Sequence, residues 1–538
     1  MVLLGAIVCV FLGGLSSASE PTPAYSPRHI DFPGVQVVYH VSEGTPGVKS
    51  RLLYEVSSRV TDVREQKIVK CRSLQEPDCL VSPEKNFAAF SLLKNCEDKE
   101  SENCVEAVWI SNGENTYMEA QFVRQIGGYS IPADKSVEYV GGDSASIWRV
   151  VGAPHVGEEE EYLVVPELST FYEPTGGKFL PSKFSLSVIP FKAKKGNFKA
   201  DRFVTDEELA GREREVPAEQ RRYVEKVAQG TGDPSCVFSD DGYCGVQYDF
   251  QQKARVKVAV RLSKSLGGWF RGRIQDPKID VKSFSNTSNV FTVEGENVKI
   301  PRMVHLVPYD VLAGQEQANF VKYFWGGAAP GDLLAGPEAD GGDRAFEFID
   351  LYRSAIKDTA AGFTSAWNFS TVNAGQGSSC LTDTTKVLGV VTTNSMAYEG
   401  TAPRFVDGSL DYRVAGLHFA PDGKTEVKGT YDLIMRSETA RCLYGFTNAP
   451  ISATISVTSD SGENSIATTQ VSEENGWLKL GAYNFTFSNP TVKVKLAQVK
   501  AASPVVAQKK KSITCVKGKT VKKVTGVNPK CPTGFRKR

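Results

Sequence analysis

Residues 142–146 have the form of a catalytic nucleophile block. They read Gly-Asp-Ser-Ala-Ser, which fits the pattern G-D-S-x-S. A serine in such a block needs a general base, usually a histidine that a carboxylate orients. The companion pattern D-x-x-H occurs at none of the five histidines. We therefore interpret Gly141-Gly142-Asp143 as a turn that leads into a strand at residues 147–151, and we predict no catalytic residue.

Two acidic, glycine-containing stretches carry the oxygen ligands that Ca²⁺ prefers. One contains Glu338, Asp340 and Asp343, and the other is Asp240-Asp241-Gly242, which lies between two cysteines. Neither stretch has the spacing of an EF-hand, so we expect a surface loop and a tight turn. We predict no metal site and no cofactor, with calcium as the alternative.

Carboxylates and tryptophans also bear on sugar chemistry. A glycosidase needs only two carboxylates at a suitable separation, and the 62 Asp and Glu residues give no reason to choose any pair. Trp148 and Trp477 lie in patterns typical of a core. Trp269 precedes Phe-Arg-Gly-Arg, and Trp325 is flanked by a phenylalanine and two glycines. These two tryptophans are the candidates for an exposed ligand contact.

Ten cysteines follow the first eighteen residues, and they fall along the chain as neighbouring pairs. An even number behind an apolar leader predicts a disulfide framework in an oxidising compartment. Structural zinc sites favour C-x2-4-C spacing, whereas the first three pairs here share C-x7-C. The connectivity does not follow from the sequence, so nearest-neighbour pairing is the simplest hypothesis. The pairs are Cys71/Cys79, Cys96/Cys104, Cys236/Cys244, Cys380/Cys442 and Cys515/Cys531.

Residues 1–18 are typical of a cleaved signal peptide. Val2–Leu15 is apolar and uncharged, and it is too short to span a bilayer comfortably. Small residues at 16–18 suit cleavage after Ala18, although the leader lacks the usual basic residue at its start. No later stretch reaches eighteen consecutive apolar residues, so we predict no transmembrane segment. The protein is expected to be extracellular or on the cell surface.

Positive charge gathers at the C-terminal end. Eleven Lys and Arg residues and no acidic residue lie between positions 509 and 538. Without these eleven cations, the net charge of +1 becomes −10 for the rest of the chain. Such a tail is either a solvated spacer or an electrostatic anchor to an anionic surface, such as wall teichoic acid, acidic glycan or lipid headgroups. The candidate anion-binding residues are Lys509, Lys510, Lys511, Lys517, Lys519, Lys522, Lys523, Lys530, Arg536, Lys537 and Arg538.

We favour the anchor because Cys515 and Cys531 would close the segment into a loop, which a spacer does not need. Gly518, Gly526 and Pro529 mark turns that could form a hairpin within that loop. Nucleic acid is not expected as a partner, because a single aromatic residue in the tail gives too little stacking surface.

Alternation of apolar and polar residues dominates the rest of the chain. Val256, Val258, Val260 and Leu262 alternate with charged or small residues, as in a half-buried antiparallel strand. Similar patterns predict strands at 35–41, 52–60, 146–151, 183–191, 430–436, 451–457, 477–480 and 492–496. The expected fold is mainly β, with several antiparallel β-sandwich domains in series.

Helix signals are few. Ser82-Pro83-Glu84 predicts a helix start, with the helix running to Leu93. Thr205 and Glu208 have the spacing of a capping box, and Pro217 then predicts two short helices in place of one. A third helix is expected at 345–357.

Length and composition divide the chain into a series of segments. A signal peptide (1–18) precedes a β domain with two C-x7-C pairs (19–200) and a charged helical connector (201–233). Two β-sandwich domains follow at 234–345 and 346–500, and a linker with the basic tail occupies 501–538.

The tail also resembles a known type of module. Ser512–Lys519, Lys522–Gly526 and Pro529–Pro532 resemble a basic, two-cysteine C-terminal module of exported actinobacterial surface proteins. Tyr431-Asp432-Leu433, Arg441–Thr447 and Gly476–Leu480 resemble a domain that often precedes it. The resemblance implies a secreted bacterial surface protein with no established activity, and it implies no site residues.

The sequence is consistent with three hypotheses for function. The first is a secreted, non-enzymatic envelope protein that adheres, assembles or binds a ligand while its tail holds an anionic wall polymer or glycan. The alternatives are a secreted glycan hydrolase and a soluble carbohydrate-binding protein.

Overall fold

The computed structural model describes residues 23–24, 34–39, 47–60, 63–113, 116–230, 232–233, 235–308, 333–336, 339, 342–372, 378–458, 464–465, 467–487, 490–498 and 511–538. The predicted signal peptide and most of the predicted linker lie outside these residues. No helix in the described ranges is long and apolar enough to cross a membrane.

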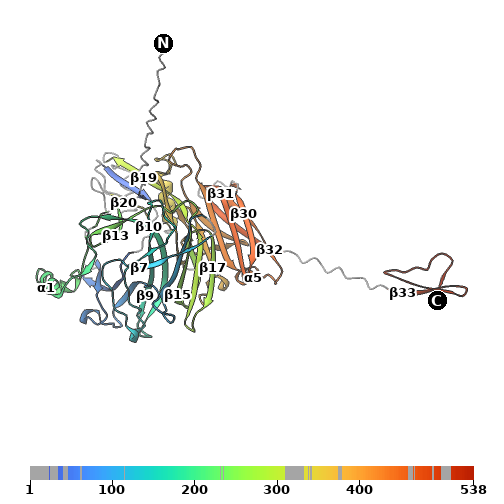
Figure 1. Cartoon of the computed structure of the whole chain (residues 1–538), viewed down its shortest axis with the longest axis horizontal. Coiled ribbons are helices and arrows are strands. Elements are labelled where there is room, and N and C mark those ends of the chain that lie inside the picture. The colour runs from blue at the N-terminus through green and yellow to red at the C-terminus, as the bar shows by residue number, and fades with distance from the viewer. Residues whose placement is uncertain are drawn as a thin grey trace, which may run out of the picture.

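A sheet of fifteen strands forms the centre of the molecule (Figure 1). Its main path runs in the order β3 (Val63–Cys71), β2 (Arg51–Val60), β4 (Asn86–Leu92), β9 (Glu161–Glu173), β10 (Lys178–Lys195), β22 (Asn368–Val372), β16 (Gly268–Arg273), β23 (Val387–Thr393), β27 (Lys428–Arg436), β31 (Trp477–Thr486) and β30 (Thr468–Glu474). The strands β7 (Gln121–Gln125), β8 (Ser146–Arg149), β13 (Cys236–Asp240) and β14 (Tyr243–Gln247) join beside this path.

Two further sheets pack on this central sheet. The five-stranded sheet has the order β17 (Gln275–Ser283), β18 (Ser288–Glu296), β15 (Arg255–Ser263), β5 (Cys104–Ser111) and β6 (Met118–Glu119). The six-stranded sheet contains β24 (Ala397–Tyr398), β26 (Ser409–Ala415), β32 (Thr491–Gln498), β28 (Ile451–Thr458) and β29 (Asn464–Ser465), with β25 (Arg404–Val406) paired to β26.

Three smaller sheets complete the described part. A four-stranded sheet has the order β20 (Leu333–Ala335), β1 (Gly34–Tyr39), β19 (Val298–Pro308) and β21 (Gly362–Ala366). A short pair joins β11 (Arg202–Phe203) to β12 (Val227–Ala228). The C-terminal sheet is formed by β34 (Thr520–Gly526), β33 (Lys511–Lys517) and β35 (Arg536–Lys537).

The mainly β fold with several antiparallel sheets is confirmed, because nearly all the described strand pairs are antiparallel. The pairs β16–β23 and β1–β20 are parallel. Alternation placed the strands correctly: Val256, Val258, Val260 and Leu262 of β15 are all fully buried. This result is expected where one face of a strand packs on a second sheet.

Strand pairing crosses the boundaries that the sequence suggested. β10 pairs with β22, so that Ser185 lies opposite Ser370, and β5 pairs with β15. The boundaries near residues 200, 233 and 345 therefore do not separate independent sheets. Period-two patterns locate strands, but the partner of a strand is chosen by long-range packing that the local pattern does not encode.

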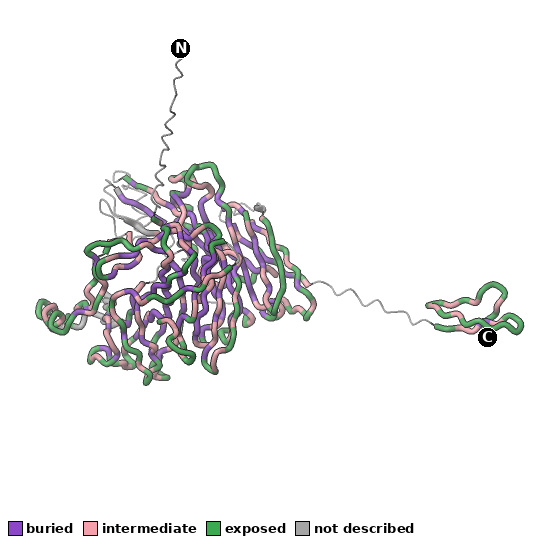
Figure 2. Tube along the Cα trace, viewed as in Figure 1, coloured by how far each residue is buried: buried purple, intermediate pink, exposed green. Residues whose placement is uncertain are grey.

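Apolar side chains fill the space between the stacked sheets, and Figure 2 shows buried residues along the centre of the strands. One core cluster joins Val108 and Val258 of the five-stranded sheet to Leu186 and Phe369 of the central sheet. A second cluster packs the six-stranded sheet, through residues such as Tyr412, against the β27–β31 face of the central sheet. The central sheet is thus shared by two sandwiches.

Helices are few and short in the described part. α1 (Asp206–Arg214) begins at the predicted capping box, where Thr205 and Glu208 exchange side-chain-to-backbone hydrogen bonds. A 3₁₀ helix, η3 (Ala218–Tyr223), follows Pro217 as a second short element, and α3 (Asp343–Arg353) matches the third predicted helix. The remaining helices are α4 (Ser379–Thr382), α5 (Ser437–Tyr444), η1 (Pro77–Cys79) and η2 (Lys135–Val137).

The helix predicted at 82–93 is wrong. Most of this segment forms β4, which pairs with β2 on one side and β9 on the other. Phe87 and Ala89 are buried while their neighbours are more exposed, which is the alternation of a strand. The Ser-Pro signal before it marks a turn.

Candidate functional site

The ten cysteines form five disulfides, and the nearest-neighbour pairing is confirmed. The bonds join Cys71 to Cys79, Cys96 to Cys104, Cys236 to Cys244, Cys380 to Cys442 and Cys515 to Cys531.

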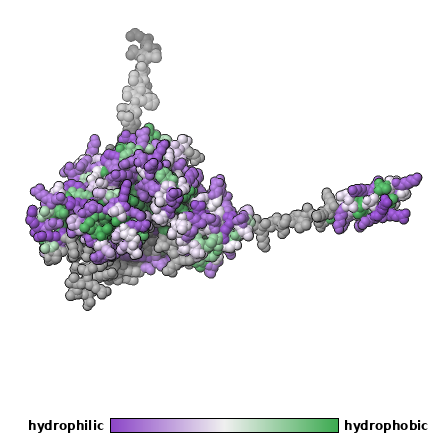
Figure 3. Space-filling view, turned by 90° about the horizontal axis from the view of Figure 1, so that it is seen from below, coloured by the Kyte–Doolittle hydropathy of each residue, from purple (hydrophilic) through white to green (hydrophobic). Residues whose placement is uncertain are grey.

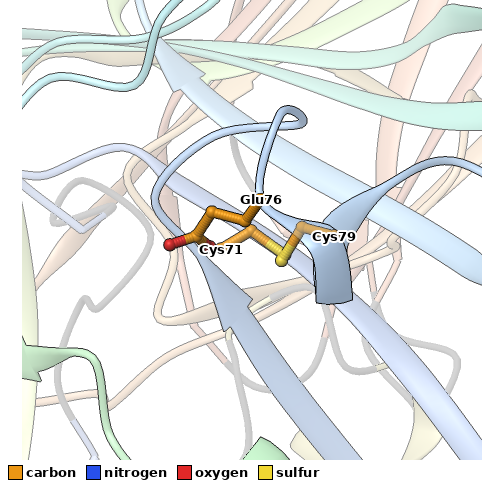
Figure 4. Close-up of side chains that lie close together, drawn as sticks. All are labelled: Cys71, Glu76 and Cys79. Atoms are coloured by element: carbon orange, nitrogen blue, oxygen red, sulfur yellow. A yellow bond between two sulfur atoms is a disulfide. The ribbon is translucent and has the colours of Figure 1, made fainter. Parts of the chain in front are cut away.

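Figure 4 shows Cys71, Cys79 and Glu76, whose potential metal-binding atoms lie close together. The two sulfurs are bonded to each other, and the Glu76 carboxylate accepts hydrogen bonds from Arg72 and Lys226. Although burial raises it, these contacts hold the pKa of Glu76 below its usual value. The group is therefore a structural bridge and an ion pair.

The serine and the carboxylates that the sequence analysis considered for catalysis or calcium binding also form structural contacts where they are described. The Ser144 hydroxyl is buried and donates a hydrogen bond to the carbonyl of Ile126 at 2.8 Å. The Asp240 carboxylate accepts hydrogen bonds from Arg124 and from the Gly127 amide. In the other calcium candidate, Glu338 and Asp340 lie outside the described residues, and Asp343 pairs with Arg413.

Trp269 does not form an exposed contact, so that part of the prediction is wrong. It lies on β16 in the interior of the central sheet and is fully buried. Its indole N–H donates to the carbonyl of Leu381 at 3.0 Å. Gly389 on the neighbouring strand makes room for the ring, since an added Cβ there would lie 2.4 Å from it. Trp325 lies outside the described residues.

The basic C-terminal segment folds as a small module, which we define as residues 511–538. β33 and β34 form a hairpin that turns at Gly518, whose φ of 57° favours glycine. β35 pairs with the other edge of β33. The Cys515–Cys531 bond closes the module, and Cys515 is its buried centre.

Nine of the eleven candidate cations belong to the described module, and all nine are exposed. Lys509 and Lys510 lie outside the described residues. No ion pair engages the nine cations within the described part of the chain, and the module contains no acidic residue. Figure 3 shows hydrophilic side chains over most of the module, with small apolar areas between them.

The short strand β35 and the residue that follows it place three consecutive cations beside two valines. Arg536, Lys537 and Arg538 line one side of a concavity of about 380 Å³. Val516, Gly518 and Val521 line the rest. The cations can therefore approach an anion while the valines support the aliphatic parts of their side chains.

The structure also brings together a charged cluster that sequence reasoning missed. Asp276 of β17 accepts a hydrogen bond from Arg255 of β15 at 3.1 Å, and it forms a direct ion pair with Lys479 of β31. Asp432 of β27 lies beside them, and Tyr483 of β31 donates its hydroxyl hydrogen bond to that carboxylate. These residues lie on four strands from three distant parts of the chain, so no local spacing could have indicated them.

No protein family, curated protein or solved structure matches the chain.

Proposed function

We propose that the protein is an exported, non-enzymatic component of a cell envelope, whose C-terminal module holds it to an anionic wall polymer. The observation that supports this proposal most directly is the set of nine exposed cations on one disulfide-closed module, none of which forms an ion pair among the described residues. The resemblance of the tail to a module of exported actinobacterial proteins points in the same direction.

The disulfides support the export step. Such a framework persists in oxidising compartments and is rare in a reducing cytosol. In this chain five bonds use every described cysteine, and four of them lie in the body. A protein that is stabilised in this way belongs outside the cytosol.

Electrostatics support the anchoring step. Each Lys or Arg near an anionic surface contributes about 1 kcal/mol of attraction, which ionic strength screens. The module concentrates such residues, whereas the chain before position 509 carries a net charge of −10. An anionic polymer would therefore attract the module and repel the body, which leaves the body displayed away from the wall.

The experiment compares the full chain with a chain that ends at Ser503. None of the described strand pairs joins the module to the body, so the shortened chain keeps the sheets of the body. Both proteins are sedimented at low salt with purified Gram-positive walls. We expect the full chain to sediment with the walls and the shortened chain to stay in solution.

Two further samples identify the ligand. The first is the same wall after its phosphodiester polymer has been removed, and the second is vesicles of an anionic phospholipid. Loss of binding to the stripped wall supports a wall polymer as ligand. Equal binding of the full and shortened chains to intact walls would contradict the proposal. Binding of the full chain to vesicles but not to walls would contradict it as well.

A further inference from the structure

The charged cluster holds an amine and a carboxyl group in direct contact between two sheets. Lys479 lies on β31 of the central sheet, and Asp276 lies on β17 of the five-stranded sheet. Their side chains form an ion pair although the residues are 203 positions apart in the chain. The Lys479 side chain is 18% exposed and the Asp276 side chain is 40% exposed. The contact keeps the Lys479 nitrogen close to the Asp276 carboxyl carbon.

A second carboxyl group lies next to this pair. Asp432 is fully buried on β27, and one of its oxygens accepts the backbone N–H of Asp276 at 3.2 Å. The other oxygen accepts the hydroxyl hydrogen bond of Tyr483. Burial raises the pKa of Asp432 to about 6, so this group can gain or lose a proton near neutral pH. It is therefore suited to transfer protons for its neighbours.

The backbone at Asp276 has an unusual shape that positions both groups. The register of β17 shifts between Gln275 and Lys278, as in a β-bulge, and Asp276 has a φ of 51°. A non-glycine residue in this region is held there by its surroundings, and such positions occur often at functional sites. Here the bulge points the amide of Asp276 at Asp432. Arg255 binds the carboxylate oxygen Oδ2, which leaves Oδ1 to Lys479.

We infer that Lys479 and Asp276 are joined by an intramolecular amide bond, and that Asp432 is the residue that transfers protons during its formation. The Nζ atom of Lys479 attacks the Cγ atom of Asp276, so a C–N bond forms and a C–O bond breaks. Two protons pass in turn from Nζ through Asp432 to the departing oxygen. The ammonium and the carboxylate thus condense to an amide and one water molecule, and no other reactant is needed.

The position of the bond gives it a structural role. It would connect β17 to β31 and so join the five-stranded sheet to the central sheet by a covalent link. This role is independent of the C-terminal module, because Asp276, Asp432 and Lys479 all lie in the body. It would suit a protein that has to stay folded outside the cell, where no chaperone repairs it.

Mass spectrometry of the denatured full chain tests the inference directly. After all disulfides have been reduced and alkylated, we expect a mass lower by one water molecule than the mass of the same polypeptide without the bond. A protease digest should contain one branched peptide that carries Asp276 and Lys479. Separate, unmodified peptides for the two residues would overturn the inference, and so would an amide at a different pair.

Two variants test the roles of the residues. Lys479→Arg keeps the positive charge but removes the primary amine, and Asp432→Asn keeps the side-chain shape but removes the titrating group. In each variant, the measured mass should equal the mass calculated for that polypeptide without an amide bond between residues 276 and 479. A branched peptide that persists in Asp432→Asn would refute the role of Asp432. If a variant does not fold, the digest of the natural chain still decides whether the bond exists.

A matched control uses another close ion pair. The Nζ atom of Lys194 lies 2.6 Å from Oδ2 of Asp233 at the surface of the body, and the two side chains are 51% and 30% exposed. The variant Lys194→Arg should keep the branched peptide and the lower mass. A gain of one water in this control would show that the loss does not depend on Lys479, which would contradict the assignment.

Discussion

The three consecutive cations at the end of the module provide a quantitative test of the anchoring proposal. Arg536, Lys537 and Arg538 are exposed, and the structure shows no ion pair for them among the described residues. If each contributes about 1 kcal/mol near an anionic surface, their replacement by glutamine should weaken wall binding by about 3 kcal/mol, or about 150-fold. The assay is a binding isotherm of the full-length variant on purified walls at low salt.

A matched variant separates local charge from net charge. Lys199, Lys282 and Lys424 are exposed on the body, so their replacement by glutamine changes the net charge by the same amount. This variant should bind like the natural chain. The difference between the two variants should shrink as salt is raised, because the Debye length falls from about 10 Å at 0.1 M to about 3 Å at 1 M. Equal affinities of both variants at low salt would show that the module's cations are not the wall contact.

Other predictions concern the stability of the body, and urea unfolding measures each of them. Burial lowers the pKa of His155 to about 4, so the unfolded chain binds a proton that the native chain lacks between about pH 6.5 and 4. Stability should therefore fall by up to about 3 kcal/mol as the pH is lowered through this window, and His155→Gln should reduce that dependence. Gly245→Ala should destabilise the protein by about 1–3 kcal/mol, because the new Cβ would lie 2.1 Å from a buried phenylalanine ring. Gly211→Ala, in the exposed helix α1, should instead be neutral or stabilising. Replacement of Cys380 and Cys442 by serine opens a loop with a sequence separation of 62 and should cost about 4 kcal/mol.

Local patterns predicted the strands of this protein because burial is decided residue by residue along each strand. The alternation around Val258 corresponds to β15, and the apolar positions near Leu433 correspond to β27. The pairing partner of each strand was not predictable in the same way. The pairing of β10 with β22 joins residues far apart in the chain, and it depends on packing with both neighbouring sheets.

The error at Trp269 has a physical cause. Two arginines follow it within four residues, and arginine usually indicates a surface. In the structure Arg273 is fully buried, and its guanidinium donates hydrogen bonds to the carbonyls of Thr393, Ser395 and Met396. A buried cation that is satisfied by backbone carbonyls gives no sign of itself in the sequence.

Helix α5 was missed for a related reason. It begins after Arg436, which makes no side-chain capping bond, so the usual start signal is absent. Its end is marked by Gly445, which has a φ of 65° and lies in the left-handed region typical of a helix end. A stop signal without a start signal did not suffice to predict a helix of eight residues.

The C-terminal module and the charged cluster around Asp276 differ in how much of each could be predicted from the sequence. The module follows from composition, because its cations and its two cysteines are neighbours in the chain. The cluster of Asp276, Asp432 and Lys479 depends on a β-bulge and on the packing of two sheets, and neither has a local signature. Only the folded chain brings these groups together.

The most direct test of the account is the location of the protein in the cells that make it. The full chain and the chain that ends at Ser503 are produced at equal levels, and each is measured in the washed wall fraction and in the medium. We expect the full chain to stay with the wall until salt releases it, whereas the shortened chain should be found in the medium. Equal partition of the two chains, or retention of both in the cytosol, would contradict the proposed function.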